Sequence, residues 1–163
     1  ITRKLLIHKH SPECMKWQLW LDDFGSLGTH TIFLAVTLLC YLAGNVFVAK
    51  QLLIAYIIVS ALTVITRLLH FKQRPDKTSH KDWMEKVQAG SFPSGHASRI
   101  TALLIIVGNF LNAPNFLVVS GLLVLAVAAA RIKQNKHDIV DAVFGIILGA
   151  AVGMAVILLL PTG

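Results

Sequence analysis

Charged residues are scarce in this chain of 163 residues. They make up 14% of the sequence, against 55% hydrophobic residues, and the mean hydropathy is +0.69. A water-soluble domain of this size cannot easily bury so large an apolar share. We therefore expect an integral membrane protein.

Acidic residues are the scarcer charged type, since 8 Asp and Glu stand against 15 Lys and Arg, a formal net charge of +7. Such an excess indicates a nucleic-acid-binding protein when the basic residues form one solvated patch or arm. Here the basic residues are separated by long apolar runs. This distribution argues against nucleic acid as a partner.

Cysteine is almost absent. Cys14 lies in a polar N-terminal stretch and Cys40 lies inside an apolar run, so they do not form the pattern of a disulfide framework. We expect two unpaired thiols.

Long apolar runs are the main positive feature. A helix needs about 20 apolar residues to cross the hydrocarbon core of a bilayer. Lys50 is expected in a tight turn between the first two runs, which should pack antiparallel. Residues 112–115, which include Pro114, are expected to form the turn before the fourth run. We predict an all-α membrane bundle with about five transmembrane helices, at residues 29–49, 51–71, 97–111, 116–132 and 137–160.

The remaining segments are polar. Residues 1–28 alternate tryptophans with charged residues, a pattern that fits an interfacial helix or an amphipathic helix packed on protein. Residues 72–95 form the long polar loop between runs. We treat residues 1–163 as one domain, with a transmembrane bundle over 29–160.

The last run contains a ridge of small residues, Gly145, Gly149 and Gly153. Such a ridge lets another helix approach closely. We expect it to pack inside the molecule, while a dimer contact is the alternative, and the oligomeric state stays open.

Unusual polar residues gather at four helix ends that share one membrane face if successive runs alternate in direction. Arg67 and Arg74 are seven apart, so both should lie on one side of the second span before Pro75 ends it. His137 and Asp141 are four apart, which predicts a single helical face. The full set is Arg67, Arg74, Ser94, Gly95, His96, Arg131, His137 and Asp141.

This set suits a phosphate group. Guanidinium forks match phosphate geometry, and Ser94 with Gly95 offers a hydroxyl and free amide groups at a helix start. Asp141 would orient His137 for attack on phosphorus, and His96 would protonate the departing oxygen. The arrangement demands no metal and no other cofactor.

Three motifs carry a resemblance to the type 2 phosphatidic acid phosphatase superfamily, over residues 67 to 141. In chain order they are Arg67-x6-Arg74-Pro75, Pro93-Ser94-Gly95-His96 and Arg131-x5-His137-x3-Asp141. The resemblance implies a helical bundle and metal-independent hydrolysis through a phosphohistidine. It makes His137 the nucleophile that Asp141 orients, His96 the acid and base, and the remaining motif residues the phosphate ligands.

The chain departs from the family pattern at two positions. Arg67 stands where the family usually has lysine, and Ala130 where it usually has serine. Membrane members commonly have six helices, and the first run here resembles the family's second. The family's first helix is therefore absent from this chain or replaced by the tryptophan segment.

We expect a lipid phosphatase, because the phosphate pocket would lie at the membrane face of a protein with little soluble mass. Candidate substrates are phosphatidate, phosphatidylglycerophosphate and a polyprenyl diphosphate. The alternative is a catalytically weak membrane protein that binds lipid phosphates, suggested by Arg67 and Ala130.

The basic residues outside this set are expected to have no role in the reaction. Arg99, Lys133 and Lys136 are expected to snorkel to headgroup phosphates. Only Lys50 lies opposite the site, so the positive-inside rule favours a cytoplasmic site. The family resemblance implies instead a periplasmic, luminal or extracellular site, which we adopt.

Overall fold

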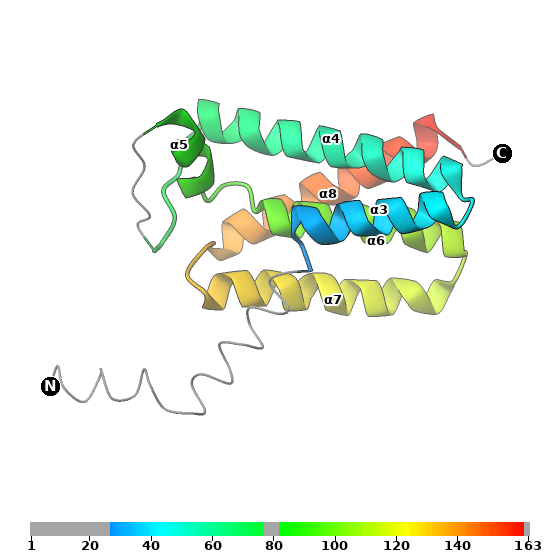
Figure 1. The fold of residues 1–163 in the computed structure, drawn as a ribbon. Coiled ribbons are helices and arrows are strands. Elements are labelled where there is room, and N and C mark those ends of the chain that lie inside the picture. Colours follow the sequence, from blue (N-terminus) through cyan, green and yellow to red (C-terminus); the bar gives the residue numbers. More distant parts are fainter. Residues whose placement is uncertain (1–26, 77–81, 162–163) are drawn as a thin grey trace, which may run out of the picture.

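The computed structural model describes residues 27–76 and 82–161. These residues form a bundle of helices (Figure 1). The prediction of an all-α fold is therefore confirmed. Most of the predicted interfacial segment, residues 1–26, lies outside the described residues. The helices are α3 (His30–Leu42), α4 (Val46–Leu69), α5 (Trp83–Ala89), α6 (Gly95–Leu111), α7 (Pro114–Lys133) and α8 (Ile139–Leu159).

Three of these helices are long and apolar enough to cross a bilayer, namely α4, α7 over Asn115–Lys133, and α8. The apolar helices α3 and α6 are shorter, with 13 and 17 residues. Many apolar side chains on the three long helices are exposed, among them Leu122, Leu125 and Leu158. Exposed apolar faces of this kind suit contact with lipid, so the helices are consistent with a membrane protein.

The first helix ends seven residues earlier than expected, at Leu42 and not at residue 49. Helix α3 ends at Leu42, and the chain reverses through Gly44, whose φ of 82° is left-handed, and Asn45. A left-handed turn needs glycine more than it needs a charge, and Lys50 is an exposed residue inside α4. The prediction that Lys50 forms the turn was wrong, while the antiparallel packing of α3 on α4 is confirmed (Figure 1).

The turn before α7 lies within the predicted residues 112–115 but is shorter than predicted. Asn112 adopts the left-handed conformation (φ 47°) at the end of α6, and Pro114 is the first residue of α7. Proline suits this position because its missing N–H has no partner to lose there. Pro114 therefore starts the helix rather than filling the turn.

The glycine ridge packs inside the molecule, as expected. A Cβ at Gly145 would lie 2.6 Å from the carbonyl oxygen of Ser94, and one at Gly153 would lie 3.3 Å from the Ala102 backbone. Helix α8 therefore lies directly on α6, which also packs against α4 and α7. This central place of α6 sets the position of its N-terminus, where the functional side chains gather.

The end of α4, the start of α6, the end of α7 and the start of α8 lie at one end of the bundle, beside α5 (Figure 1). The shared face predicted from alternating spans is thus present in the arrangement of these helices.

Candidate active site

The polypeptide between α4 and α6 folds back on itself and carries Arg74. Helix α4 ends at Leu69, so Arg74 lies outside the helix and not two turns along it from Arg67 as expected. An antiparallel bridge joins Gln73 to Gly90. The Arg74 Nε donates to the Gly90 carbonyl at 3.4 Å, and its amide donates to the Ala89 carbonyl at 3.2 Å. Backbone contacts, rather than a helix, therefore position this guanidinium.

Arg67 is buried near the end of α4 and holds the same loop from the other side. Its Nη1 donates to the Val87 carbonyl at 3.0 Å and its Nη2 to the Pro93 carbonyl at 3.1 Å. Its Nε is buried and has no hydrogen-bond partner among the described residues. Arg67 thus fixes the segment that leads into α6 and keeps one N–H unused.

Ser94 caps the start of α6 and joins it to α8. Its Oγ accepts from the Ala97 amide at 3.5 Å, and its own amide donates to the Asp141 carbonyl at 2.9 Å. Both Ser94 and Gly95 are buried. The beginning of α6 is therefore held against the first turn of α8, with its positive dipole end directed to this region.

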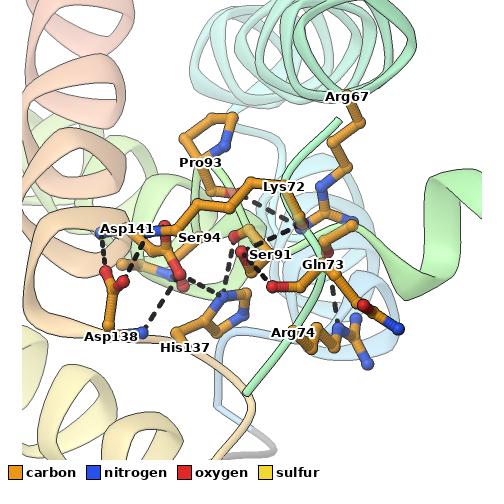
Figure 2. A network of polar contacts seen from close by, with 12 residues as sticks. Arg67, Lys72, Gln73, Arg74, Ser91, Pro93, Ser94, His137, Asp138 and Asp141 are labelled. Carbon is orange, nitrogen blue, oxygen red and sulfur yellow. Dashed lines mark hydrogen bonds and ion pairs between the residues drawn. The ribbon is translucent and has the colours of Figure 1, made fainter. Parts of the chain in front are cut away.

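His137 is buried at the junction of α7 and α8. Its Nδ1 lies 2.8 Å from the Ser91 carbonyl oxygen (Figure 2). A carbonyl can only accept a hydrogen bond, so Nδ1 carries the proton and Nε2 keeps its lone pair. The buried Nε2 has no partner among the described residues. The ring is thus held in the tautomer that a nucleophile requires.

Asp141 does not hydrogen-bond His137 as the sequence suggested. Helix α8 begins at Ile139, so His137 precedes it and the two residues do not share a helical face. The Asp141 Oδ2 lies 3.9 Å from Nδ1, too far for a hydrogen bond. The carboxylate acts on the ring through its charge, and the Ser91 carbonyl supplies the hydrogen bond.

Lys72 binds the carboxylate from the far side (Figure 2). Its Nζ lies 2.7 Å from Asp141 Oδ1 and 2.5 Å from Asp138 Oδ2. Burial lowers the pKa of Lys72, but the hydrogen bonds to Asp138 and Asp141 outweigh it and raise that pKa overall. Asp138 and Asp141 also form a reciprocal capping box at the start of α8. Lys72 therefore fixes the carboxylate next to His137.

The charge around His137 keeps its ring neutral. Burial is the main cause that lowers the His137 pKa, and the positive charges of Arg67, Arg131 and Arg74 lower it further. Asp141 opposes this shift without reversing it. A neutral imidazole with a free Nε2 can attack phosphorus, whereas a protonated one cannot.

Arg131 and Ala130 lie in the last turn of α7. The Arg131 Nη1 donates to Gln134 Oε1 at 2.9 Å, and Ala130 is buried. The three arginines of the motifs thus come from α4, the following loop and α7, and their charges converge on His137.

The expectation that Arg99 snorkels to the membrane surface was wrong. Arg99 is only 5% exposed, and its Nε donates to the Gly28 carbonyl at 2.9 Å. It lines a cavity of about 250 Å³ together with His96 and Arg67. Lys136 binds Asp76 at 2.6 Å, at the other side of the site.

Sequence reasoning missed three participants: Lys72, the Ser91 carbonyl and Arg99. Two carboxylates three residues apart at a helix start, Asp138 and Asp141, were a signal that a cation should lie nearby. The Ser91 carbonyl could not be predicted as the partner of His137, because every residue has a backbone carbonyl and the sequence does not show where it points. The apolar run that follows Arg99 indicated that its charge would be costly to bury.

Two curated relatives match this chain, both named decaprenylphosphoryl-5-phosphoribose phosphatase, from Mycobacterium tuberculosis strains CDC 1551 / Oshkosh and ATCC 25618 / H37Rv. Each is 33% identical over 96 residues, which cover 59% of this chain and 52% of the relative. The chain thus spans about half the length of the curated relatives it matches. No solved structure matches it.

The family model described as PAP2 superfamily matches residues 48–162. This stretch contains all three motifs, together with Lys72 and Ser91. The chain therefore belongs to the PAP2 superfamily, the type 2 phosphatidic acid phosphatases.

Proposed function

We propose that this protein is a phosphatase that hydrolyses a phosphate ester or diphosphate of a membrane lipid through a phosphohistidine, without a metal ion. The observation that carries the proposal is the buried His137 ring. Its Nδ1–H is held by the Ser91 carbonyl, its Nε2 is unpartnered among the described residues, and three arginine charges surround it.

In the first step, His137 Nε2 attacks phosphorus and the bond from phosphorus to the leaving oxygen breaks. His96 donates a proton to that oxygen, so the lipid departs as an alcohol or a monophosphate. Arg67, Arg74 and Arg131 stabilise the charge on the phosphoryl oxygens, with the Ser94 and Gly95 amides at the start of α6.

In the second step, water attacks the phosphohistidine. His96, now lacking its proton, accepts one from that water, and His137 leaves with its Nε2 lone pair restored. Asp141, held by Lys72, stabilises the positive charge that the phosphorylated ring carries. Because guanidinium groups supply the charge stabilisation, the chemistry needs no cofactor.

A lipid substrate is supported by the surroundings of the site. The helices whose ends build it expose long apolar faces, and the relatives' name describes a substrate with a decaprenyl chain. A lipid tail would stay among these faces while its phosphate reaches His137. Phosphatidate, phosphatidylglycerophosphate and a polyprenyl diphosphate are the substrates we propose to assay.

We further propose that α3 and α6 complete a bundle of about five membrane helices in one domain, with residues 1–28 as an interfacial segment. The site would face the periplasm, lumen or exterior. The basic residues at this end are largely engaged: Arg67 and Arg99 are buried, and Lys72 and Lys136 bind aspartates. Fewer of them are therefore free to act as positive-inside signals.

The test is phosphate release from these lipids by the purified chain with a chelator present, comparing wild type with His137→Asn. We expect a loss of at least about 1,000-fold, because the nucleophile is removed. His70→Asn, which changes an exposed histidine at the end of α4, should retain activity. Acid-labile radiolabel on wild type but not on His137→Asn would identify the phosphohistidine.

The alternative function is lipid-phosphate binding with little catalysis. Ala130, buried where the family has serine, favours it because a hydroxyl is missing beside the arginines. Its mark would be equal lipid binding by wild type and His137→Asn, with no phosphate released by either.

A further inference from the structure

The His96 ring, which donates the proton in the proposed reaction, is held differently from the His137 ring. His137 Nδ1 is fixed by the Ser91 carbonyl at 2.8 Å. Among the described residues, no hydrogen bond to the His96 ring is present, and His96 is only partly buried beside the cavity that it lines. A general acid must lie within hydrogen-bond reach of the oxygen that it protonates. The direction of the His96 ring therefore depends on the groups packed around it.

Gly28, two residues before the start of α3, packs directly on His96. A Cβ built on Gly28 would lie 2.8 Å from both the Cα and the Cβ of His96, and 2.6 Å from the His96 carbonyl oxygen. Any residue other than glycine would have to move one of the two backbones, and Gly28 is itself buried. Gly28 therefore packs against the first atom of the His96 side chain and limits the space in which that side chain can turn.

Arg99 holds Gly28 in this place. Its Nε donates to the Gly28 carbonyl at 2.9 Å, in a hydrogen bond between buried groups. His96 and Arg99 are three residues apart in α6, so they are neighbours on the helix surface. Gly28 is thus joined to one turn of α6 twice, through the hydrogen bond from Arg99 and through its packing on His96. We call Gly28 and Arg99 the His96 support.

We propose that the two residues of the His96 support are positioning residues for the catalytic acid, which direct the His96 ring toward the leaving oxygen. Arg99 acts through the hydrogen bond from its Nε and not through its charge on the phosphate. The proposal rests on the proposed function, since it needs a reaction in which His96 is the acid. It gives a role to Arg99, a buried charge that none of the three motifs includes.

Two substitutions of Arg99 separate its hydrogen bond from its charge. The Nε2 of glutamine is as many bonds from the backbone as the Nε of arginine, so Arg99→Gln keeps a donor for the Gly28 carbonyl and removes the charge. Arg99→Met has a similar length and no donor. If Arg99 positions His96, Arg99→Gln should recover most of the activity that Arg99→Met loses. If Arg99 acts through its charge, both variants should lose the same activity.

The readout is the dependence of kcat on the leaving group, measured with the full chain in detergent micelles. The probes are hexadecyl phosphate and a hexadecyl-substituted nitrophenyl phosphate. An alkoxide needs a proton from the acid in order to leave, whereas a nitrophenolate leaves without one. For Arg99→Met we expect kcat on hexadecyl phosphate to fall about 10- to 100-fold, with KM for both lipids and kcat on the nitrophenyl lipid changed by less than about threefold. A general loss of structure would lower kcat on both lipids.

Gly28→Ala tests the packing contact independently of Arg99. Its added Cβ has to displace His96, so the same selective loss on hexadecyl phosphate is expected. Gly121→Ala is the matched control, because a Cβ there meets nothing within 4 Å, and it should change neither rate. His96→Asn sets the upper limit of the effect, since it removes the acid itself and should be selective in the same direction.

The outcomes separate this inference from the proposed function. If wild type hydrolyses neither lipid, the proposed function fails and the positioning role fails with it. If wild type hydrolyses only the nitrophenyl lipid, the phosphatase stands, but no acid acts in it and the positioning role is overturned. If wild type hydrolyses both lipids, a loss in Arg99→Met that is absent, equal on both lipids or not recovered by Arg99→Gln also overturns it. A loss confined to hexadecyl phosphate and recovered by Arg99→Gln supports it.

Discussion

His137 is fixed by two different contacts, a hydrogen bond from its Nδ1 to the Ser91 carbonyl and the charge of Asp141 at 3.9 Å. A backbone carbonyl cannot be removed by substitution, so the tautomer is secured by the fold of the loop before α6. The position of this loop depends in turn on Arg67, which donates to the Val87 and Pro93 carbonyls.

The lowered pKa of His137 predicts the pH dependence of activity. Burial and the neighbouring arginines lower it from 6.5, so the neutral form of the ring is favoured at pH 6.5. Activity should be lost as the pH falls through the lower, folded-state value. The acid limb of kcat/KM should therefore lie below pH 6.5. Lipid phosphates also titrate in this range. The acid limb of kcat/KM should therefore be measured with two substrates whose phosphates have different pKa values. An apparent pKa that is the same for both substrates belongs to the enzyme. An enzyme limb above pH 6.5 would contradict the prediction.

Lys72 should be required although the motifs specify no residue at its position. Lys72→Met leaves Asp141, which is fully buried, without its cation. We expect kcat to fall by about 10- to 100-fold, because the carboxylate that stabilises the phosphorylated ring loses its position. Lys72→Arg should recover part of the loss.

Lys136→Met is the control for Lys72. Lys136 also binds an aspartate, Asp76, but at the exposed edge of the site. Exposed ion pairs contribute little, about 0–1 kcal/mol, so this variant should keep most of the activity. If kcat falls by a similar factor in Lys72→Met and Lys136→Met, activity depends on the positive charge near the site and not on the position of Asp141.

At the level of single residues, the sequence was informative where a residue type is tied to its chemistry. Arginines, histidines and an aspartate at helix ends in an apolar chain indicate an anion site. The sequence could not tell which atom orients His137, because that depends on where the Ser91 carbonyl points. Arg99 was misread because one buried arginine looks the same in sequence as one at the membrane surface.

Among the helices, the pair α6 and α8 is the most closely packed, and glycine makes this possible. A Cβ at Gly149 would lie 2.9 Å from Thr101 Cβ and closer still to the Ser98 carbonyl oxygen. Real Cβ contacts are not so short, so even alanine must push the helices apart. Since Ser94 and Asp141 join the same two helices, a shift here would also disturb the site.

We expect Gly149→Ala to lower the free energy of unfolding by about 1–3 kcal/mol. Its melting temperature in detergent and its activity should both fall. Gly121→Ala on α7 is the matched control, because a Cβ there meets nothing within 4 Å. That variant should be neutral or slightly stabilising, since alanine favours helix over glycine. Equal melting temperatures for both variants would show that the α6–α8 contact can adjust without loss.

The helices themselves were predictable from apolar runs, but three of their ends were not. Lys50 and Pro114 were assigned to turns, while the structure places both in helices. The first reversal uses Gly44, which was not predicted, and the second uses Asn112, which lies within the predicted turn. Turn formation depends on backbone conformation, which charge and proline content indicate only weakly. The end of α4 at Leu69 likewise depends on the pairing of Gln73 with Gly90, a contact between distant residues that the helical pattern does not reveal.

For the whole molecule, the orientation in the membrane can be decided with two reporters at opposite ends. Glu85→Cys lies on α5 beside the site and Lys50→Cys near the far turn, and both residues are exposed. In a background with Cys14 and Cys40 replaced by serine, an impermeant thiol reagent should label position 85 in intact cells and position 50 only after lysis. The reverse pattern would place the site in the cytoplasm.

The buried Gly28 sets the depth of the site. It packs against His96, since a Cβ at Gly28 would lie 2.6 Å from the His96 carbonyl oxygen. Helix α3 starts two residues later and reaches the far turn after 13 residues (Figure 1), a length of about 20 Å. The hydrocarbon core of a bilayer is about 30 Å thick. If the far turn lies at the opposite membrane surface, as in the proposed bundle, His96 is expected below the level of the headgroups.

A reacting group at that depth changes what counts as substrate concentration. The enzyme would sample lipids in the plane of its own bilayer or micelle, and its rate should follow their mole fraction there rather than their amount per volume. Diluting the substrate with inert detergent at constant bulk concentration should therefore slow the reaction. Water-soluble phosphate esters, which do not partition, should be poor substrates at any concentration.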